Sequence, residues 1–334
     1  MKKFVNQVDN MLAESLSGFA KAHTDLVSLH LAPNYLTRKT KANNKVAIIS
    51  GGGAGHEPLH AGFIGKGMLD AACPGQVFTS PTPDQMIAAA EAVHADKGVL
   101  FIVKNYAGDV MNFEMAAEML PFENATVLTS DDCAVINSTY TEGRRGVAGT
   151  VIVEKCVGSL AETGADLRTC KAFGYKINAQ TASIGVALTS CTVPAAGKPT
   201  FAINESEIEM GVGIHGEPGR RRETMREADA IINDMIDAIL ADLQSRKISY
   251  KKGAEILLLI NGLGATPLME LYLLYNTAEK RLNDHGLKIE RSLVGNYTTA
   301  IDMAGASITV CVLDDEIKQH WDSPVHTAAL RWSI

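Results

Sequence analysis

Apolar residues in the first half of the chain gather in three short continuous runs, each followed by glycine or polar residues. The runs are KVAIIS, GVLFIVK and ATVLTS, which occupy Lys45–Ser50, Gly98–Lys104 and Ala125–Ser130. Continuous apolar runs of this length, without alternation, are typical of strands buried on both faces of a parallel sheet. We therefore predict three parallel strands in this part of the chain.

Helical patterns separate these runs. The spacing of apolar residues predicts a helix within 5–22, and Thr82-Pro83-Asp84 is a start signal for a helix from 83 onward, with Thr82 as its N-cap. Further helices are predicted at 111–120 and 149–163. Strands that alternate with helices indicate βαβ units, and ligands in such sheets lie beyond the carboxyl ends of the strands. The loops at 51–56 and 105–109 should therefore meet at one rim of the sheet.

The second half of the chain also mixes strands and helices. Its predicted strands are Ile184–Thr189, Glu255–Ile260 and Ser307–Leu313, and its predicted helices are 222–243 and 267–282. No low-complexity linker separates the halves, so we expect them to pack tightly. The predicted fold class is α/β, with two packed α/β domains at 1–185 and 186–334 and a largely parallel buried sheet in the first.

Composition narrows the class of protein. The 334 residues carry a net charge of −7, which argues against a direct nucleic-acid contact, because such surfaces need a basic stripe. No stretch reaches the roughly 18 apolar residues of a membrane helix, and no signal peptide is recognisable at the N-terminus. The six cysteines contain no C-x-x-C pair, which is typical of a reduced compartment. We therefore expect a cytoplasmic protein without a membrane partner.

The segment GGGAGHEP at 51–58 follows the first predicted strand directly. Its glycines allow the backbone to approach a ligand closely and to point N–H groups at it. The segment has no Lys-Ser/Thr ending, so it is not a Walker P-loop. A plain glycine turn is the alternative, but the adjoining His56-Glu57 pair favours a ligand site.

Asp109 closes the second loop, NYAGD, and Lys104 ends the strand before it. A carboxylate at this rim can accept a hydroxyl proton, a step typically worth about 10²–10⁴-fold in rate. The alternative is that Asp109 caps the helix that follows. One carboxylate cannot easily fill both roles, and Asn112 is the other candidate for one of them.

The stretch GVGIHGEPG at 211–219 places His215 between glycines on a loop. Its glycines formally match G-x-G-x-x-G, which raises the alternative of a nucleotide-dependent oxidoreductase. The preceding residues are polar, however, and Pro218 prevents an immediate helix, so a dinucleotide site is the weaker interpretation. His215 completes no apolar face, which favours a functional role. The echo between GHEP and HGEP suggests two histidines directed at one ligand.

No metal site is predicted. The histidines show no metal-ligand spacing, and the acidic cluster at 314–316 fits a solvated turn better than a Mg²⁺ site.

Eight segments resemble the substrate-binding subunit of dihydroxyacetone kinases, in the same order and over nearly the whole chain. They are GGGAGHEP at 51–58, FTSPTPDQ at 78–85, VKNYAGD at 103–109, GRRGVAGT at 143–150, CTVPAAGKP at 191–199, GVGIHGEPG at 211–219, NGLGATPLMELY at 261–272 and WDSPVHTAAL at 321–330.

The resemblance implies an α/β homodimer in which His215 adds to the ketone carbonyl of dihydroxyacetone as a hemiaminal. It also implies that His56 assists proton movement and that Asp109 activates the hydroxyl to be phosphorylated. The positions implied to contact the substrate are Gly53, Ser80 and Lys104. The tether is chemically reasonable, because an imidazole nitrogen adds to the carbonyl carbon of dihydroxyacetone and cannot add to glycerol. Shape alone typically discriminates between ligands as similar as these two by about 10–200-fold.

The phosphate donor is expected elsewhere, because the chain carries no P-loop, protein-kinase or metal-nucleotide motif. It resembles the split systems, in which a separate nucleotide-holding subunit carries ADP and Mg²⁺ and a phosphotransferase-system protein supplies the phosphate. We therefore expect no cofactor on this chain. Two alternatives stay open: a paralogue that binds dihydroxyacetone as a transcriptional co-activator, and a related ketose such as erythrulose as ligand. Ala54, Ala107 and Ala300 replace hydroxyl residues common in the family.

Overall fold

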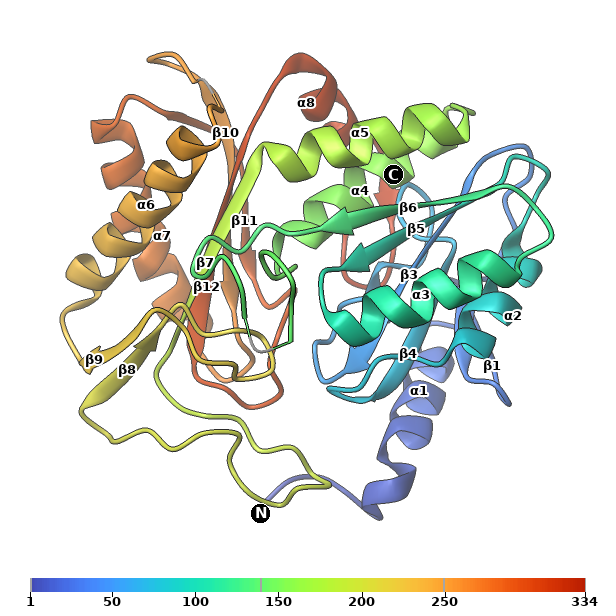
Figure 1. Ribbon diagram of the computed structural model, residues 1–334, viewed down its shortest axis with the longest axis horizontal. Coiled ribbons are helices and arrows are strands. Elements are labelled where there is room, and N and C mark those ends of the chain that lie inside the picture. The colour runs from blue at the N-terminus through green and yellow to red at the C-terminus, as the bar shows by residue number, and fades with distance from the viewer. Residues whose placement is uncertain (1, 139, 249, 334) are drawn as a thin grey trace.

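The computed structural model describes residues 2–138, 140–248 and 250–333 and contains two six-stranded sheets (Figure 1). The first sheet has the order β1-β2-β4-β3-β5-β6. Its strands are β1 (Val27–His30), β2 (Tyr35–Arg38), β3 (Ala47–Ala54), β4 (Ala71–Val77), β5 (Val99–Lys104) and β6 (Asn124–Thr129). Strands β4, β3, β5 and β6 run parallel, while β1 and β2 pair antiparallel at one edge. The predicted buried, largely parallel sheet is confirmed.

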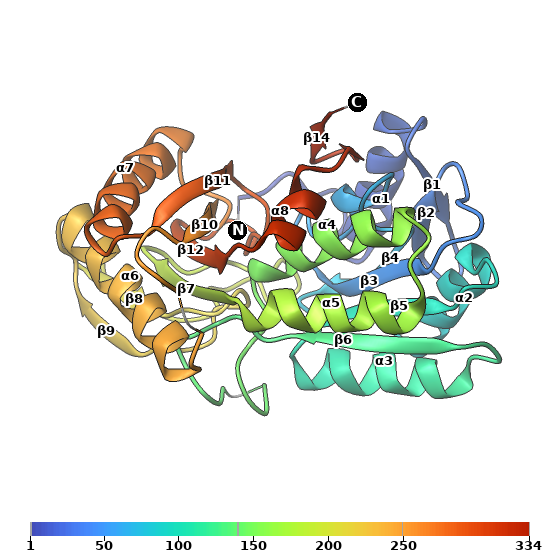
Figure 2. The same ribbon diagram turned by 90° about the horizontal axis from the view of Figure 1, so that it is seen from above.

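Helices cover both faces of this sheet (Figure 2). On one face α2 (Pro83–Val93) and α3 (Ala107–Met119) pack on apolar residues of β3 and β5, and on the other face lie α4 (Gly149–Glu162) and α5 (Leu167–Ala179). The predicted start of α2 is confirmed, with Thr82 and Gln85 forming a capping box. Helix α1 (Met11–Ala22) follows the 3-10 turn η1 (Val8–Asn10), and a second such turn, η2 (Ala61–Phe63), precedes β4.

The second sheet has the order β11-β10-β12-β7-β8-β9 and is mostly antiparallel. Its strands are β7 (Thr181–Ala187), β8 (Glu207–Met210), β9 (Arg221–Thr224), β10 (Glu255–Gly262), β11 (Lys288–Gly295) and β12 (Gly305–Val312). Helices α6 (Ala228–Ser245) and α7 (Leu268–Asp284) cover one face. The chain then forms α8 (Asp315–Asp322), β13 (Val325–His326) and β14 (Arg331–Trp332).

Helix α4 lies between the two sheets, and its residues from Gly149 to Ala161 are all buried. One core cluster joins side chains of α4 with Leu257 of β10 and Cys311 of β12. The two sheets therefore share a core. The predicted boundary at residue 185 falls inside β7, and the division into two domains stays a prediction.

Three local expectations were wrong. Gly51–Gly53 belong to β3 rather than to a loop, because their backbone pairs in parallel with Cys73–Gly75 of β4. The helix predicted from residue 222 starts at Ala228, since Arg221–Thr224 pair with β8 as an edge strand. Helix α3 begins at Ala107 and not at 111.

In the part of the chain that is described, no helix has both the length and the apolar character needed to cross a bilayer.

Candidate active site

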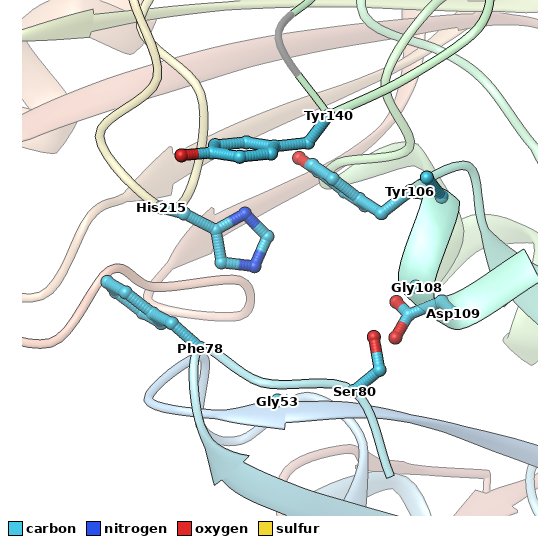
Figure 3. Close-up of a pocket in the computed structure, with 9 residues that line it drawn as sticks. Gly53, Phe78, Ser80, Tyr106, Gly108, Asp109, Tyr140 and His215 are labelled. Carbon is cyan, nitrogen blue, oxygen red and sulfur yellow. The ribbon is translucent and has the colours of Figure 1, made fainter. Parts of the chain in front are cut away.

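A cavity of about 350 Å³ lies where the carboxyl ends of β3, β4 and β5 face a loop of the second sheet (Figure 3). Its lining residues are Gly53, Phe78, Ser80, Tyr106, Ala107, Gly108, Asp109, Tyr140 and His215. The two rim segments predicted to converge therefore do so. The loop between β8 and β9 adds His215 from the other sheet.

Two histidines form the centre of the site. His56 Nε2 lies 3.0 Å from His215 Nε2, so the two histidines do meet, while their action on one ligand stays a prediction. His56 is buried, and its Nδ1 lies 2.7 Å from the backbone oxygen of Thr299. Burial, together with the charges of His215 and Lys104, holds the pKa of His56 well below its ordinary value. His56 is therefore neutral, with Nδ1–H donating to Thr299 and a lone pair on Nε2.

Glu217 orients His215. The carboxylate accepts from the His215 backbone N–H at 2.9 Å and lies 2.8 Å from His215 Nδ1. Burial alone would raise the pKa of Glu217, but His215 and Arg145 outweigh it and hold the pKa at about 2. An ionised Glu217 fixes the proton of His215 on Nδ1 and leaves Nε2 as the nucleophilic nitrogen.

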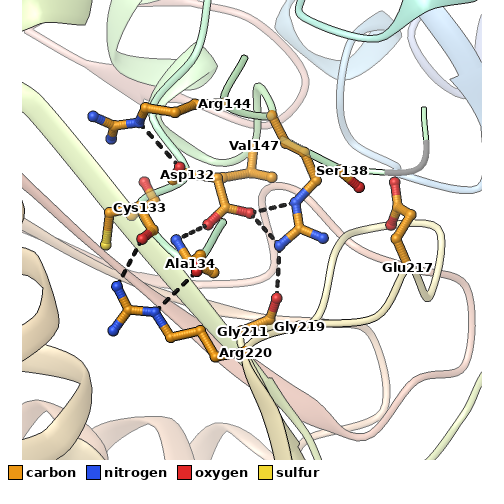
Figure 4. Close-up of polar contacts among 12 residues, drawn as sticks. Asp132, Cys133, Ala134, Ser138, Arg144, Val147, Gly211, Glu217, Gly219 and Arg220 are labelled. Carbon is orange, nitrogen blue, oxygen red and sulfur yellow. Dashed lines mark hydrogen bonds and ion pairs between the residues drawn. The ribbon is translucent and has the colours of Figure 1, made fainter. Parts of the chain in front are cut away.

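A buried ion pair holds this loop in place (Figure 4). The Arg145 guanidinium lies 2.7 Å from Asp132 Oδ2 and donates to the backbone oxygens of Gly211 at 2.6 Å and Pro218 at 3.3 Å. Asp132 and Arg145 precede α4, whereas Gly211 and Pro218 flank His215 in sequence. The pair therefore ties the histidine loop to the first sheet.

Asp109 lies in the first turn of α3, and the N-cap position belongs to Tyr106. The interpretation of Asp109 as the N-cap was therefore wrong, which leaves its carboxylate available to the cavity. Figure 3 shows the Ser80 hydroxyl on the same side of the cavity as the Asp109 carboxylate. Asn112, the other candidate, donates to the backbone oxygen of Pro81 at 2.8 Å.

Lys104 does not line the cavity. Its ammonium lies behind Asp109, 3.4 Å from Asp109 Oδ2, and donates to the backbone oxygen of Gly51 at 3.3 Å. Direct contact of Lys104 with a substrate stays a prediction, as do the substrate contacts of Gly53 and Ser80, which do line the cavity.

Aromatic rings pack around His215. Its ring meets Tyr106 edge-on at 4.6 Å and Phe78 at 5.1 Å between centroids. Tyr106 Oη is buried without a hydrogen-bond partner in the described ranges, and burial raises the pKa of this phenol. These rings reduce the access of water to the nucleophile.

Other features of the sequence fall outside this site. The Gly211–Gly216 segment connects two antiparallel strands and opens no helix, so it lacks the context of a dinucleotide site. Asp314 caps α8 by accepting from the Ile317 N–H at 2.9 Å. All six cysteines are free and buried.

Sequence reasoning missed the residues that support the histidines. Glu217 was visible within GIHGEPG, and its two-residue spacing from His215 was the available signal. Arg145 and Asp132 carried no such signal, because Arg145 contacts the histidine loop across a long stretch of chain and Asp132 acts through Arg145. Tyr140 carried no signal in the sequence, and Phe78 stood out only as the first residue of FTSPTPDQ, without a predicted role.

The fold and the paired histidines define an α/β ligand-binding protein whose site lies between two sheets. The model of the Dak1 domain matches residues 17–329. The chain therefore belongs to the Dak1 family.

Relatives of named function support this membership. The chain is 48% identical to the PEP-dependent dihydroxyacetone kinase, dihydroxyacetone-binding subunit DhaK, of Escherichia coli strain K12, over 99% of both chains. It is 46% identical to the corresponding PTS-dependent subunit of Listeria innocua, over 95% of both.

Solved structures give two further comparisons. The dihydroxyacetone kinase operon co-activator DhaQ aligns with a TM-score of 0.88 at 32% identity, over 95% of this chain and 97% of that one. The dihydroxyacetone kinase of C. freundii aligns with the same TM-score and identity, over 98% of this chain but 60% of that one.

Proposed function

We propose that this chain is the dihydroxyacetone-binding subunit of a phosphotransferase-system-dependent dihydroxyacetone kinase, a glycerone kinase and therefore a transferase. His215 holds dihydroxyacetone as a hemiaminal while a separate subunit delivers phosphate. The observation that carries the proposal is the contact between the two histidine Nε2 atoms beside a cavity that also contains Asp109.

The hydrogen-bond partners of the two histidines determine where a proton must lie. The backbone oxygen of Thr299 accepts a hydrogen bond from His56 Nδ1–H, and the Glu217 carboxylate accepts one from His215 Nδ1–H. Each Nε2 would therefore present a lone pair to the other. Two lone pairs at 3.0 Å repel, and the contact therefore requires one additional proton between the two rings. The site thus holds both a nucleophile and an acid.

Addition to the ketone uses both groups. His215 Nε2 bonds to the carbonyl carbon, the carbonyl π electrons move to oxygen, and His56 Nε2 gives that oxygen the shared proton. The His215 ring becomes cationic, and the Glu217 carboxylate at 2.8 Å stabilises the positive charge. A polyol has no carbonyl carbon and cannot form this bond.

Phosphoryl transfer follows on the tethered ketone. Asp109 accepts the proton of the terminal hydroxyl, whose oxygen attacks the phosphorus atom. Fixing that hydroxyl beside the phosphorus atom lowers the activation free energy through proximity, an effect that reaches roughly 7–11 kcal/mol in well-oriented systems. We assign ADP and Mg²⁺ to the nucleotide-holding subunit and the original phosphate to a phosphotransferase-system protein. The proposal includes a cytoplasmic homodimer.

Intact-mass measurement after incubation with dihydroxyacetone tests the tether. We expect a mass increase of one dihydroxyacetone molecule, its absence with glycerol, and its loss in His215→Ala. Mixing the chain with a nucleotide-holding subunit and its phosphorylated donor then tests the transfer, with dihydroxyacetone phosphate as the expected product. Absence of the adduct in the unmodified chain would contradict the proposal.

The similarity to the DhaQ co-activator supports a second candidate function, a ketone-responsive co-activator without turnover. Identity of 48% to a kinase subunit against 32% to the co-activator favours the kinase. Adduct formation without product, together with a ketone-dependent complex with a DNA-binding protein, would favour the co-activator. A parallel assay with erythrulose tests the ligand, since one relative at 36% identity is named D-erythrulose kinase.

A further inference from the structure

Four ionisable side chains form a row from the cavity into the protein interior. Lys104 Nζ lies 3.4 Å from Asp109 Oδ2 and 3.0 Å from His60 Nε2. His60 Nδ1 lies 2.5 Å from Glu154 Oε1. None of the four is more than 6% exposed. The chemistry proposed above uses only Asp109 and leaves the other three without a role.

The hydrogen bonds set the direction of donation along this row. The Ser50 hydroxyl donates to the backbone oxygen of Ile102 at 2.7 Å, so its oxygen accepts from His60 Nδ1–H at 2.9 Å. His60 Nε2 is then the acceptor for the Lys104 ammonium. Each member of the row therefore donates to the next, beginning at Lys104.

The third member of the row, His60, lies beside a second cavity. This cavity of about 310 Å³ lies on the α1 side of β3, and His60 borders it together with Phe19 and Cys73. Gly53 borders both this cavity and the one that contains His215. A proton that reaches His60 is thus separated from the ligand cavity by β3.

Glu154 lies on α4, between the two sheets, and is not fully satisfied. Its Oε2 is buried and has no hydrogen-bond partner among the residues described. Burial raises the pKa of Glu154 to about 8, although Ser50 and Lys104 oppose this shift. A carboxyl group of this kind exchanges a proton near neutral pH, whereas a purely structural carboxylate is normally paired at both oxygens.

We propose that Asp109, Lys104, His60 and Glu154 form a proton relay that removes the hydroxyl proton of the ketone during phosphoryl transfer. This inference rests on the proposed function. It assigns the last three residues as positioning and proton-transfer groups, distinct from the groups that touch the ligand.

The relay balances protons and electrons. The ligand O–H bond breaks as its oxygen bonds to phosphorus, and the proton passes to Asp109. Lys104 gives a proton to His60 Nε2 and receives the one on Asp109, and His60 releases its Nδ1 proton to ionised Glu154. The P–O bond of the donor breaks with its electron pair leaving on the donor.

The turnover rate as a function of pH tests the relay. Glu154 accepts a proton only when ionised, so kcat should rise with pH through about 8 in the complete complex. The charged or titratable groups beside Glu154 are Lys104 and His60; His56 in turn acts electrostatically on His60, and Asp109 lies 3.4 Å from Lys104. In Glu154→Gln the rise should vanish, and kcat should fall on the order of 10²-fold, the lower end for acid–base groups.

Matched variants separate the relay from stability. Glu162→Gln alters the same helix at an ion pair with Arg38, and His320→Gln alters another buried histidine, which contacts Ser159 at 3.0 Å. Both controls should keep the kcat and pH profile of the unmodified chain. The ketone adduct, measured by intact mass, should form in every variant.

Rescue by imidazole completes the test, because the second cavity borders His60. Added imidazole should restore turnover of His60→Ala about tenfold, by the general acid–base role of the lost ring, and should not affect Glu154→Gln. If His60→Ala does not fold, Glu154→Gln alone carries the test.

Turnover and pH profile that match the unmodified chain in both relay variants would overturn the relay, as would loss of the adduct in either. Absence of the adduct in the unmodified chain would instead overturn the proposed function, and the relay with it.

Discussion

The chemistry of this site depends at the residue scale on one carboxylate next to each reacting group. We expect Asp109→Asn to form the ketone adduct normally, because His215 and its partners are unchanged. Product formation should fall about 10²–10⁴-fold, the usual contribution of a general base. Intact mass and product assays measure the two effects separately. Normal turnover would exclude Asp109 as the base.

Glu217 supports the nucleophile. Its pKa lies at about 2 against an ordinary 4.5, so its folded-state pKa is depressed. The corresponding stabilisation, on the order of 3 kcal/mol at about 1.4 kcal/mol per unit, is present above pH 4.5 and disappears as the pH falls toward 2.

In Glu217→Gln we expect two results. Adduct affinity should fall about 10–100-fold, because a hydrogen bond to a charged group contributes roughly 1.5–3 kcal/mol. The acid-induced loss of stability should also become shallower between pH 4.5 and 2. Titration with dihydroxyacetone, followed by intact mass, and urea unfolding at several pH values measure these effects. Glu57→Gln is a suitable control, since Glu57 bonds the Gly55 N–H on the neighbouring loop. An adduct of undiminished affinity would contradict the role assigned to Glu217.

The arrangement of elements explains why the glycine run is strand rather than loop. A Cβ on Gly53 would lie 2.6 Å from the Thr79 backbone nitrogen, and one on Gly52 would lie 2.3 Å from Lys104 Nζ. These glycines let β3 pass between the segment after β4 and the buried lysine. Close packing therefore requires glycine at both positions.

We predict that Gly53→Ala is destabilised by roughly 1–3 kcal/mol, the usual cost of overpacking, because its new methyl group meets backbone that cannot move aside. Urea unfolding measures this change. Gly18→Ala is the control, because nothing lies within 4 Å of a Cβ there, and it should not lose stability. Equal stability of the two variants would show that the segment after β4 yields easily.

The sequence predicts the buried helices and strands better than the exposed ones. Continuous apolar runs located β3, β5 and β6, and helical patterns located α4 and most of α6, because burial dictates those patterns. The start signal Thr82-Pro83-Asp84 located α2. Edge strands such as β9 were missed, since Arg221–Thr224 are largely exposed and carry no apolar pattern. Of the site, the histidines and Asp109 were recognisable from their loops. Arg145 and Asp132, which support the histidine loop, were not recognisable, because their contacts join segments far apart in the sequence.

At the scale of the whole molecule, the site exists only because both sheets contribute to it. Arg145 and Asp132 connect the segment before α4 with the histidine loop, and Arg220 adds bonds to the backbone oxygens of Cys133 and Ala134 at 2.9 Å (Figure 4). Burial raises the pKa of Asp132 to about 6, although Arg145 opposes the shift. The folded state therefore binds more protons than the unfolded state between pH 3.8 and 6, and this group costs stability as the pH rises through that window.

Removing the Arg145 guanidinium should reveal how much the buried Asp132 carboxylate destabilises the fold. We expect the free energy of unfolding of Arg145→Met to be lower by about 3–5 kcal/mol, because the buried Asp132 carboxylate is left without its partner. The loss should be larger at pH 8 than at pH 5, since at lower pH Asp132 takes up a proton and no longer needs the cation. Adding Asp132→Asn should recover part of the stability, whereas adduct formation should stay impaired, because the Gly211 and Pro218 oxygens still lack the guanidinium. Urea unfolding at both pH values, with intact mass for the adduct, measures each effect. An adduct of normal affinity in the double variant would mean that the histidine loop keeps its position without this bridge between the sheets.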